Sequence, residues 1–147
     1  MEKRWGAGGG GHDRSTRLRL HAASEPGAPP ILALSGEFDV ANVSEIDRFL
    51  RRRLGPFYQR DDLVIDLSST TFIDSSFVSF LVRLVKELRG AGRELLLVRP
   101  AGQVRRMLAI VGLPNLVPVF DSLEDALQSL RAGPLPLIPP RFELRRA

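Results

Sequence analysis

Short apolar runs alternate with amphipathic stretches along this chain, and that alternation restricts the fold more than any other feature of the sequence. Continuous or alternating apolar runs are typical of strands, whereas apolar residues repeated about every 3.6 positions are typical of helices. These patterns predict strands at residues 17–21, 31–36, 63–67, 94–98 and 117–120. They predict helices at residues 43–54, 77–88, 104–111 and 123–130. The order β β α β α β α β α indicates an α/β domain.

The connections between these elements predict a mixed sheet. A helical crossover favours parallel neighbours, whereas the Gly- and Pro-rich loop between the first two strands allows them to pair antiparallel. Pro118 places the last strand at an edge of the sheet, because proline cannot donate to a central ladder. Gly55-Pro56 is expected to end the first helix, Gly90 to cap the second, and Ser122 to begin a capping box at the last. The fold class is therefore α/β, with the sheet covered by helices.

Composition divides the 147 residues into three segments. Residues 1–14 are predicted to be a flexible Gly-rich leader, because glycine loses the most backbone freedom on folding and has no side chain to bury. Residues 133–147 contain too many prolines for a helix or a central strand and are predicted to be a basic tail. Residues 15–132 are predicted to form one domain, which is long enough to fold without disulfides or a metal.

The formal charge of +4 lies in the two ends of the chain. Residues 1–17 and 133–147 each carry a surplus of two basic side chains, and residues 18–132 hold 14 basic and 14 acidic ones. A nucleic-acid-binding domain needs basic residues concentrated on its own face, so no direct nucleic-acid partner is predicted. The run Arg51-Arg52-Arg53 is interpreted as a solvent-facing helix end that complements the helix dipole. No apolar run approaches the roughly 18 residues of a membrane span, so we expect no span and a cytoplasmic location.

The residue types required for catalysis are scarce. The chain has no cysteine, and its two histidines, His12 and His21, lie in the leader and the first strand. No triad with a central histidine and no thiolate metal site is therefore expected. A metal site of Asp39, Asp66 and Asp74 stays open, although isolated carboxylates more often act as helix caps and loop residues. The prediction is a protein that is not an enzyme and that needs no cofactor or metal.

Hydroxyl side chains are concentrated in the segment Asp66–Ser76, between a buried strand and the strongest helix. The end of this segment, Asp74-Ser75-Ser76, falls where the first backbone N–H groups of a helix lack partners. Asp74 or Ser75 is expected to cap the helix. A serine at a helix start can also hold a phosphate, because the N–H groups and the helix dipole favour negative charge there. Phosphorylation would add about −1.5 to −2 charges beside Asp74 and repel an acidic partner.

Four segments in order and spacing resemble the STAS domains, the fold of bacterial anti-sigma-factor antagonists. The stretch from Leu63 to Phe77 resembles the core of that family, and Gly36-Glu37-Phe38-Asp39 resembles its Gly-Glu-Leu-Asp before the first helix. Residues 92–100 resemble its next strand and exit loop, and residues 104–126 its closing helices. The resemblance covers residues 15–132 and implies a single STAS-like domain.

This resemblance implies a protein-binding module that is switched by phosphorylation. In such antagonists the first serine after the aspartate is phosphorylated by a serine kinase that also holds a sigma factor, and the unphosphorylated form binds the kinase and frees the sigma factor. Matched position by position, the acceptor is Ser75, with Ser76 as the alternative. The implied partner-binding residues are Asp39, Asp74, Ser75, Ser76 and Phe77, and the implied partner is an anti-sigma factor that is a serine kinase. An accessory subunit of a membrane transporter, with no serine switch, stays open as an alternative.

Two positions depart from the family pattern. Family antagonists usually continue with Gly-Leu-Gly after the serines, whereas this chain has Phe77-Val78-Ser79. Glycine permits the close approach of another protein's backbone, which a bulkier residue prevents. Phe77 also falls on the apolar stripe of its helix, where it would be a core residue. The exposure of Phe77 therefore decides whether the partner surface differs from that of the family.

Overall fold

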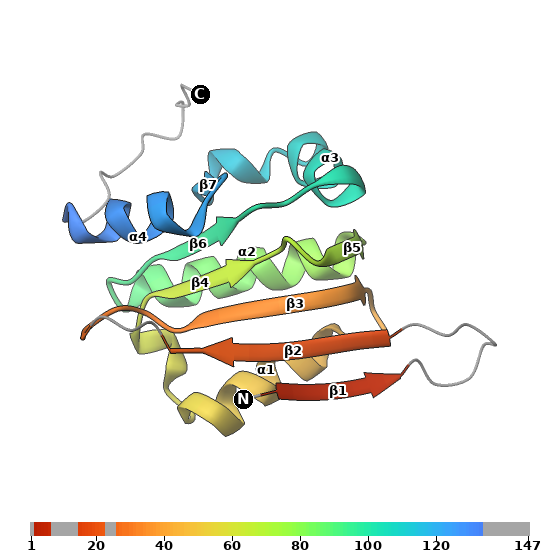
Figure 1. The fold of residues 1–147 in the computed structure, drawn as a ribbon, viewed down its shortest axis with the longest axis horizontal. Coiled ribbons are helices and arrows are strands. Elements are labelled where there is room, and N and C mark those ends of the chain that lie inside the picture. Colours follow the sequence, from red (N-terminus) through yellow and green to blue (C-terminus); the bar gives the residue numbers. More distant parts are fainter. Residues whose placement is uncertain (1, 7–14, 23–25, 134–147) are drawn as a thin grey trace.

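A seven-stranded mixed sheet lies at the centre of the structure, a computed structural model that describes residues 2–6, 15–22 and 26–133 (Figure 1). The strands are β1 Glu2–Gly6, β2 Ser15–His21, β3 Ile31–Phe38, β4 Leu63–Asp66, β5 Thr70–Ile73, β6 Leu95–Val98 and β7 Val119–Phe120. Hydrogen-bonded neighbours follow the order β1-β2-β3-β4-β6-β7, and β5 pairs with β3. β1, β2 and β3 pair antiparallel, and the other pairs are parallel. The predicted α/β class and mixed sheet are confirmed.

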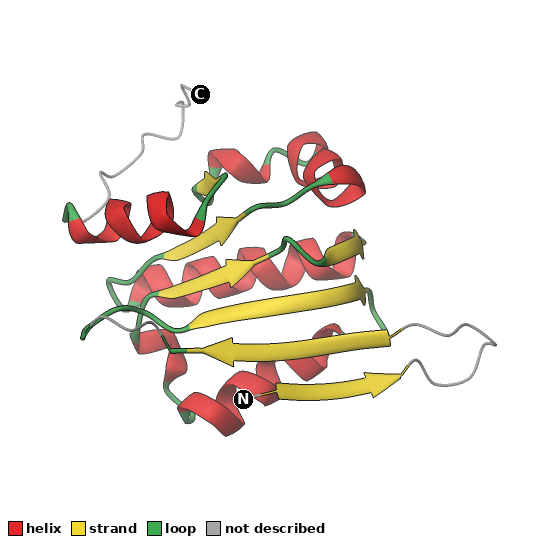
Figure 2. Cartoon of the chain, in the orientation of Figure 1, coloured by secondary structure: helices red, strands yellow, loops and turns green. Residues whose placement is uncertain are grey.

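Helices cover both faces of the sheet (Figure 2). They are α1 Val43–Leu54, α2 Ser75–Gly90, α3 Gly102–Ile110 and α4 Leu123–Arg131, with short 3-10 helices η1 Tyr58–Arg60 and η2 Leu113–Asn115. Successive side chains of a strand point to opposite faces. Ile65 and Leu97 accordingly join a core with α1, α2 and α3, while Val64 and Leu96 join a smaller core under α4. This double burial explains why the sequences of β4 and β6 are continuously apolar.

β4 and β5 both lie beside β3 and pair with different parts of it. β3 pairs with β4 through Ile31–Ala33 and with β5 through Gly36–Phe38. Between these pairs, the Thr70 hydroxyl donates a hydrogen bond to the Leu34 carbonyl oxygen (2.8 Å). The Gly36 N–H donates to the Ser69 carbonyl oxygen (3.0 Å). β5 therefore continues along β3 to the carboxyl edge of the sheet, where α2 begins.

Several predicted element boundaries are confirmed. α1 ends at Leu54 with Gly55 as its C-cap, and β7 lies at the edge of the sheet, as Pro118 predicts. The Ser122 hydroxyl accepts a hydrogen bond from the Asp125 N–H (3.0 Å) at the start of α4. These ends depend on residues that are close in the sequence, and for that reason local patterns predict them well.

The predicted cap of α2 is wrong. Gly90 is the last residue of the helix, and Gly92 takes the left-handed cap conformation with φ 75°. The Arg93 N–H donates to the Leu88 carbonyl oxygen (2.8 Å), and the Gly92 N–H donates to the Arg89 carbonyl oxygen (3.0 Å). This is the Schellman arrangement, in which a glycine relieves the steric cost of a positive φ. The helix therefore extends past the first available glycine to the second.

Two strands were absent from the predicted order. Residues 2–6 of the predicted leader form β1, which pairs with β2, so the leader prediction is wrong for those residues. Pairing with β2 supplies backbone hydrogen bonds that the composition of the segment does not reveal. β5 lies in the hydroxyl-rich segment, whose apolar pattern is too weak to predict a strand. The remainder of the leader, residues 1 and 7–14, and residues 134–147 of the tail lie outside the described residues, so the domain limits stay a prediction.

Candidate functional site

The carboxyl edge of the sheet brings together two acidic loops. Phe38 at the end of β3 and Ile73 at the end of β5 are register partners in a parallel pair. Asp39 and Asp74 are the next residues of strands that lie roughly 4.8 Å apart in a sheet. The β3–α1 and β5–α2 loops therefore lie side by side, at the right-hand end of β3 and β5 in Figure 1. Ser75 follows at once as the first residue of α2.

Asp74 is the N-cap of α2, as predicted. Its Oδ1 atom accepts hydrogen bonds from the N–H groups of Ser76 (2.9 Å) and Phe77 (3.2 Å). The expectation that these N–H groups are free to hold a phosphate is therefore wrong, because the carboxylate next to Ser75 already occupies them. A phosphate on Ser75 would add charge beside this carboxylate instead of filling a vacant anion site.

The side chains of Ser75 and Ser76 differ in accessibility. Ser75 is exposed, whereas Ser76 is half-buried. Successive side chains of an α-helix are rotated by about 100° about its axis, so two neighbouring residues can differ in this way. Of the two predicted acceptors, Ser75 is thus the one that an outside enzyme reaches without local rearrangement.

A buried asparagine shapes the loop that carries Asp39. The Asn42 Oδ1 atom accepts a hydrogen bond from the Asp39 N–H (3.0 Å), and its Nδ2 donates to the Glu37 carbonyl oxygen (2.9 Å). The Asp39 Oδ1 atom accepts from the Ala41 N–H (2.9 Å). These bonds hold Asp39 at a defined place beyond β3. The sequence analysis missed Asn42, although an asparagine directly before a helix is a recognisable signal.

Gln103 at the start of α3 holds the end of β5 from the side away from β3. The Ile73 N–H donates to the Gln103 Oε1 atom (3.1 Å), and the Gln103 Nε2 atom donates to the Ile73 carbonyl oxygen (3.0 Å). The side-chain amide thus pairs both backbone groups of Ile73, as a neighbouring strand would. α3 therefore supports the residue that precedes Asp74. No sequence pattern links positions 73 and 103, so this role had no signal in the sequence.

Phe77 is buried, with 0% of its surface exposed, and the prediction that it contacts a partner directly is wrong. Its ring centroid lies 6.0 Å from that of Phe38 and 6.3 Å from that of Phe80. The apolar stripe of α2 faces the sheet, and this explains the burial. Ser79 is exposed. The substitution of phenylalanine for the family glycine therefore changes the core beneath the site and leaves its outer surface unblocked.

Asp66 at the end of β4 is bound by an arginine. The Arg99 Nη2 atom donates to Asp66 Oδ2 (2.7 Å), and the Ser68 N–H donates to Asp66 Oδ1 (2.9 Å). Burial raises the pKa of Asp66, but the hydrogen bonds from Arg99 and Ser68 outweigh it, and the pKa lies below its ordinary value. Asp39, Asp66 and Asp74 each accept local hydrogen bonds. Within residues 2–6, 15–22 and 26–133, no group of three or more His, Cys, Asp or Glu side chains could hold a metal ion.

Two exposed apolar side chains border the acidic loops. Val40, next to Asp39, is 75% exposed, and Phe72, two residues before Asp74, is 39% exposed. Protein interfaces combine apolar and aromatic contact area with a polar rim. The edge of the sheet offers both within a few residues. The sequence analysis missed Val40 and Phe72, because strand and loop periodicity does not separate exposed from buried apolar residues.

This architecture matches that of a known protein family. The family model for the STAS domain matches residues 21–126, which contain β3, the acidic loops and the start of α2. This chain belongs to the STAS family. The resemblance noted in the sequence is thereby confirmed. The candidate site of this STAS domain consists of the β3–α1 loop, the β5–α2 loop and the first turn of α2.

Sequence relatives of this STAS domain include proteins named as antagonists of anti-sigma factors. It is 28% identical over 104 residues to the anti-sigma F factor antagonist of Paenibacillus polymyxa, an alignment that covers 68% of this chain and 85% of that protein. Relatives in Thermotoga neapolitana and Thermotoga maritima are each 29% identical, over 69 and 65 residues. Those alignments cover 47% and 44% of this chain, and the chain spans only 61% and 58% of the length of the two relatives.

Solved structures share the fold of this STAS domain. An anti-sigma factor antagonist from Mycobacterium paratuberculosis has a TM-score of 0.61 at 23% identity, over 78% of this chain and 94% of that one. SpoIIAA in its unphosphorylated form has a TM-score of 0.57 at 18% identity, over 79% and 99%. The murine anion transporter Slc26a9 has a TM-score of 0.63 at 21% identity, over 76% of this chain and 19% of the transporter. The fold therefore occurs both in small antagonists and as part of a transporter.

Of the helices within the described part of the chain, none is both long enough and apolar enough to cross a bilayer.

Proposed function

We propose that this STAS domain is an anti-sigma-factor antagonist whose binding to an anti-sigma serine kinase is switched off by phosphorylation of Ser75. The unphosphorylated domain binds the kinase in the cytoplasm, and the sigma factor held by the kinase is released. The domain acts by binding and performs no reaction itself. The observation that carries the proposal is an exposed Ser75 at the first position of α2, beside the paired loops of Asp39 and Asp74. The name of the Paenibacillus polymyxa relative supports it.

Electrostatics explain how a phosphate at this place would act as a switch. Asp39 and Asp74 follow register partners on adjacent strands, and Asp74 already uses its carboxylate to cap α2. A phosphate adds about −1.5 to −2 charges at pH 7. Beside these carboxylates and inside a protein interface, that charge causes repulsion and a desolvation cost without a ready hydrogen-bond partner. Phosphorylation of Ser75 therefore weakens binding without a change in the fold.

The surroundings of Ser75 suit a rigid docking surface. Asn42 holds the Asp39 loop, and Gln103 holds the end of β5. Val40, next to Asp39, and Phe72, two residues before Asp74, add exposed apolar area near the acidic loops. Because the supporting residues are already ordered by hydrogen bonds, a partner meets a surface that loses little conformational freedom on binding.

Mass spectrometry after incubation with the candidate anti-sigma kinase of the same organism and ATP tests the acceptor. We expect one phosphate, located on Ser75. Ser75→Ala should abolish the modification, and the matched control Ser76→Ala should retain it. Phosphate on Ser76 or Ser79 instead, with Ser75 unmodified, contradicts the proposal.

A binding measurement with the same kinase tests the switch. Ser75→Ala is expected to bind as tightly as the unmodified protein, because it keeps the docking surface and cannot be phosphorylated. Ser75→Asp is expected to bind at least about ten-fold more weakly, because like charges placed together across an interface are strongly unfavourable. Equal affinities for Ser75→Asp and Ser75→Ala would rule out a charge-based switch.

A second candidate function is an accessory subunit of a membrane transporter. The similarity of the fold to part of Slc26a9, with a TM-score of 0.63, favours it. Co-purification from the native cell separates the two functions. A serine kinase recovered with the protein, and lost with Ser75→Asp, supports the antagonist. A transporter recovered equally with Ser75→Ala and Ser75→Asp supports the subunit.

A further inference from the structure

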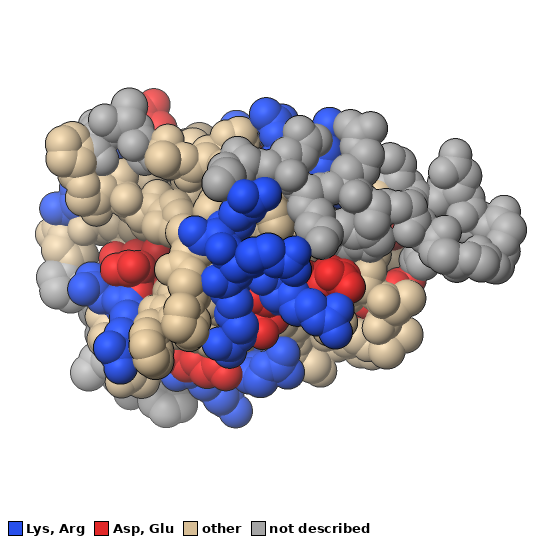
Figure 3. Space-filling model, turned by 90° about the horizontal axis from the view of Figure 1, so that it is seen from below, with Lys and Arg blue, Asp and Glu red and all other residues tan. Residues whose placement is uncertain are grey.

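Basic side chains gather on one face of the molecule, which Figure 3 shows from below, where α1 lies in Figure 1. We define the α1 basic surface by five exposed arginines on α1 and η1, namely Arg48, Arg51, Arg52, Arg53 and Arg60. α1 runs from the Asp39 loop at the carboxyl edge of the sheet back toward the start of β4. The last turn of α1 and η1 therefore lie toward the amino ends of the parallel strands, whereas Ser75 lies at their carboxyl ends. This surface is separate from the switch site and does not depend on the proposed function.

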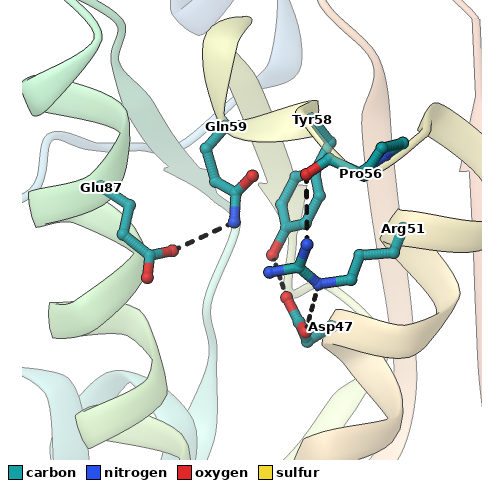
Figure 4. Close-up of polar contacts among 6 residues, drawn as sticks. All are labelled: Asp47, Arg51, Pro56, Tyr58, Gln59 and Glu87. Atoms are coloured by element: carbon teal, nitrogen blue, oxygen red, sulfur yellow. Dashed lines mark hydrogen bonds and ion pairs between the residues drawn. The ribbon is translucent and has the colours of Figure 1, made fainter.

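A hydrogen-bonded cluster fixes the turn after α1 against the helix (Figure 4). The buried Tyr58 hydroxyl donates to Asp47 Oδ1 (2.6 Å). The Arg51 Nε atom donates to Asp47 Oδ2 (2.8 Å), and the Arg51 Nη1 atom donates to the Pro56 carbonyl oxygen (3.1 Å). Burial raises the pKa of Asp47, but the hydrogen bonds from Tyr58 and Arg51 outweigh this effect, and the pKa lies below its ordinary value. The carboxylate therefore stays ionised at neutral pH. The turn is therefore held in one position.

Two apolar side chains project from the ends of this fixed turn. Phe57 is 62% exposed and Leu54 is 37% exposed. The Arg60 guanidinium carbon lies 4.4 Å from the centroid of the Phe57 ring. An exposed aromatic ring in contact with an arginine is thus presented just beyond the C-terminal end of α1. Cation–π contact keeps the ring beside a charge without burying it.

Acidic side chains of α1 pair with two of the arginines of this surface. Glu45 pairs with Arg48 (2.7 Å), and Asp47 pairs with Arg51 (2.8 Å). α2 adjoins the surface, because Gln59 of η1 donates to Glu87 Oε1 (3.3 Å). α1 and η1 together hold five arginines and two acidic side chains, Glu45 and Asp47, and Asp61 follows η1 directly. Basic and acidic residues are equal in number along residues 18–132, yet folding brings the arginines of α1 and η1 together on one surface.

We propose that the α1 basic surface binds the surface of an anionic lipid bilayer. The arginines contact the headgroups, and Phe57 and Leu54 enter the interfacial region. Stable attachment of a folded domain to a bilayer requires both basic residues and inserted apolar side chains, and this surface presents the two on one fixed turn. Non-specific binding to nucleic acid comes almost entirely from phosphate contacts and does not need exposed apolar side chains. A surface rich in arginine with protruding apolar side chains therefore favours the bilayer.

Co-sedimentation of the full chain with vesicles tests this proposal. One set of vesicles contains phosphatidylcholine alone, and the other contains phosphatidylcholine with phosphatidylglycerol. We expect binding to the mixed vesicles that weakens as salt is added. Phe57→Ala should lower the partition coefficient about ten-fold, because the inserted ring is lost. Arg52→Gln combined with Arg60→Gln should lower it about thirty-fold, because each arginine contributes to headgroup attraction.

A matched pair on another part of the molecule is the control. Arg105→Gln combined with Arg106→Gln removes the same charge from exposed positions of α3, near the other edge of the sheet. It should leave the partition coefficient within about two-fold, since these residues lie off the surface. Thermal unfolding confirms that each variant is folded. No binding to the mixed vesicles, equal binding to both vesicle types, or an equal loss with the α3 pair overturns the proposal. Binding of a DNA duplex that the α1 pair abolishes, with vesicles unbound, overturns it as well.

Discussion

Asp74 performs two tasks that one pair of substitutions can separate. Its Oδ1 atom accepts hydrogen bonds from the N–H groups of Ser76 (2.9 Å) and Phe77 (3.2 Å), and its charge lies beside Ser75. Asp74→Ala removes both the acceptor and the charge. Loss of an N-cap acceptor costs about 0.5–2 kcal/mol of stability. The Ser76 N–H loses its acceptor, whereas the Phe77 N–H keeps its hydrogen bond to the Asp74 carbonyl oxygen (3.1 Å). Because the favourable charge at the helix N-terminus is lost as well, we expect a loss near the upper end, about 2 kcal/mol.

Asp74→Asn is the matched control. Asparagine caps a helix about as well as aspartate, since its Oδ1 atom can accept the same hydrogen bonds. Only the favourable interaction of the negative charge with the helix N-terminus is lost, which is worth about 0.3–1 kcal/mol. Urea unfolding of the three proteins, followed by circular dichroism, measures both free energies. We expect Asp74→Asn to remain within about 1 kcal/mol of the parent protein.

Two results would refute this account of Asp74. One is a loss of less than about 0.5 kcal/mol for Asp74→Ala, which would mean that the two hydrogen bonds contribute little. The other is an equal loss for both variants, which would assign the stability to charge instead of capping. Binding to the anti-sigma kinase then shows which task matters to the partner, because Asp74→Asn keeps the helix start intact and removes only the charge.

Two further predictions concern the core and the pH dependence. Phe77→Ala should lower the free energy of unfolding, measured in urea, by about 3–5 kcal/mol, because the ring is fully buried. The control Phe57→Ala, at an exposed ring, should change it by less than about 0.5 kcal/mol. Equal losses for the two variants would contradict the burial of Phe77. The pKa of Asp66 is lowered in the folded protein, so its contribution is present above the unfolded pKa and is lost as the pH falls through the folded pKa. Asp66→Asn should therefore destabilise the protein at about pH 7, and urea unfolding at a series of pH values should show this loss shrinking as the pH falls below about 4.

Local chemistry explains which parts of the site were predictable. The start of α2 at Asp74 and Ser75 depends on side-chain and backbone groups within three residues of each other, and the sequence pattern located it. The same holds for the end of α1 at Gly55. Gly90 shows the limit of such reasoning, because two nearby glycines compete for the cap and the better geometry falls to Gly92.

Contacts between distant segments explain the rest. The Asp39 loop lies beside Ser75 because β3 pairs in register with β5. The apolar pattern of the sequence did not predict β5. The clamp of Gln103 on Ile73 joins residues 30 positions apart. Local propensity carries no information about such pairs, because they form only when the sheet brings the two segments together.

By itself, the sequence determined the α/β class, the main helices and strands, the family and the serine at the head of α2, since each of these follows from periodicity or from neighbouring residues. Only the tertiary structure decided that Phe77 belongs to the core, that the acidic loops meet, and that arginines from α1 and η1 share one face with an exposed phenylalanine. The physical reason is that burial and surface charge depend on which elements pack together, and packing is a property of the whole chain.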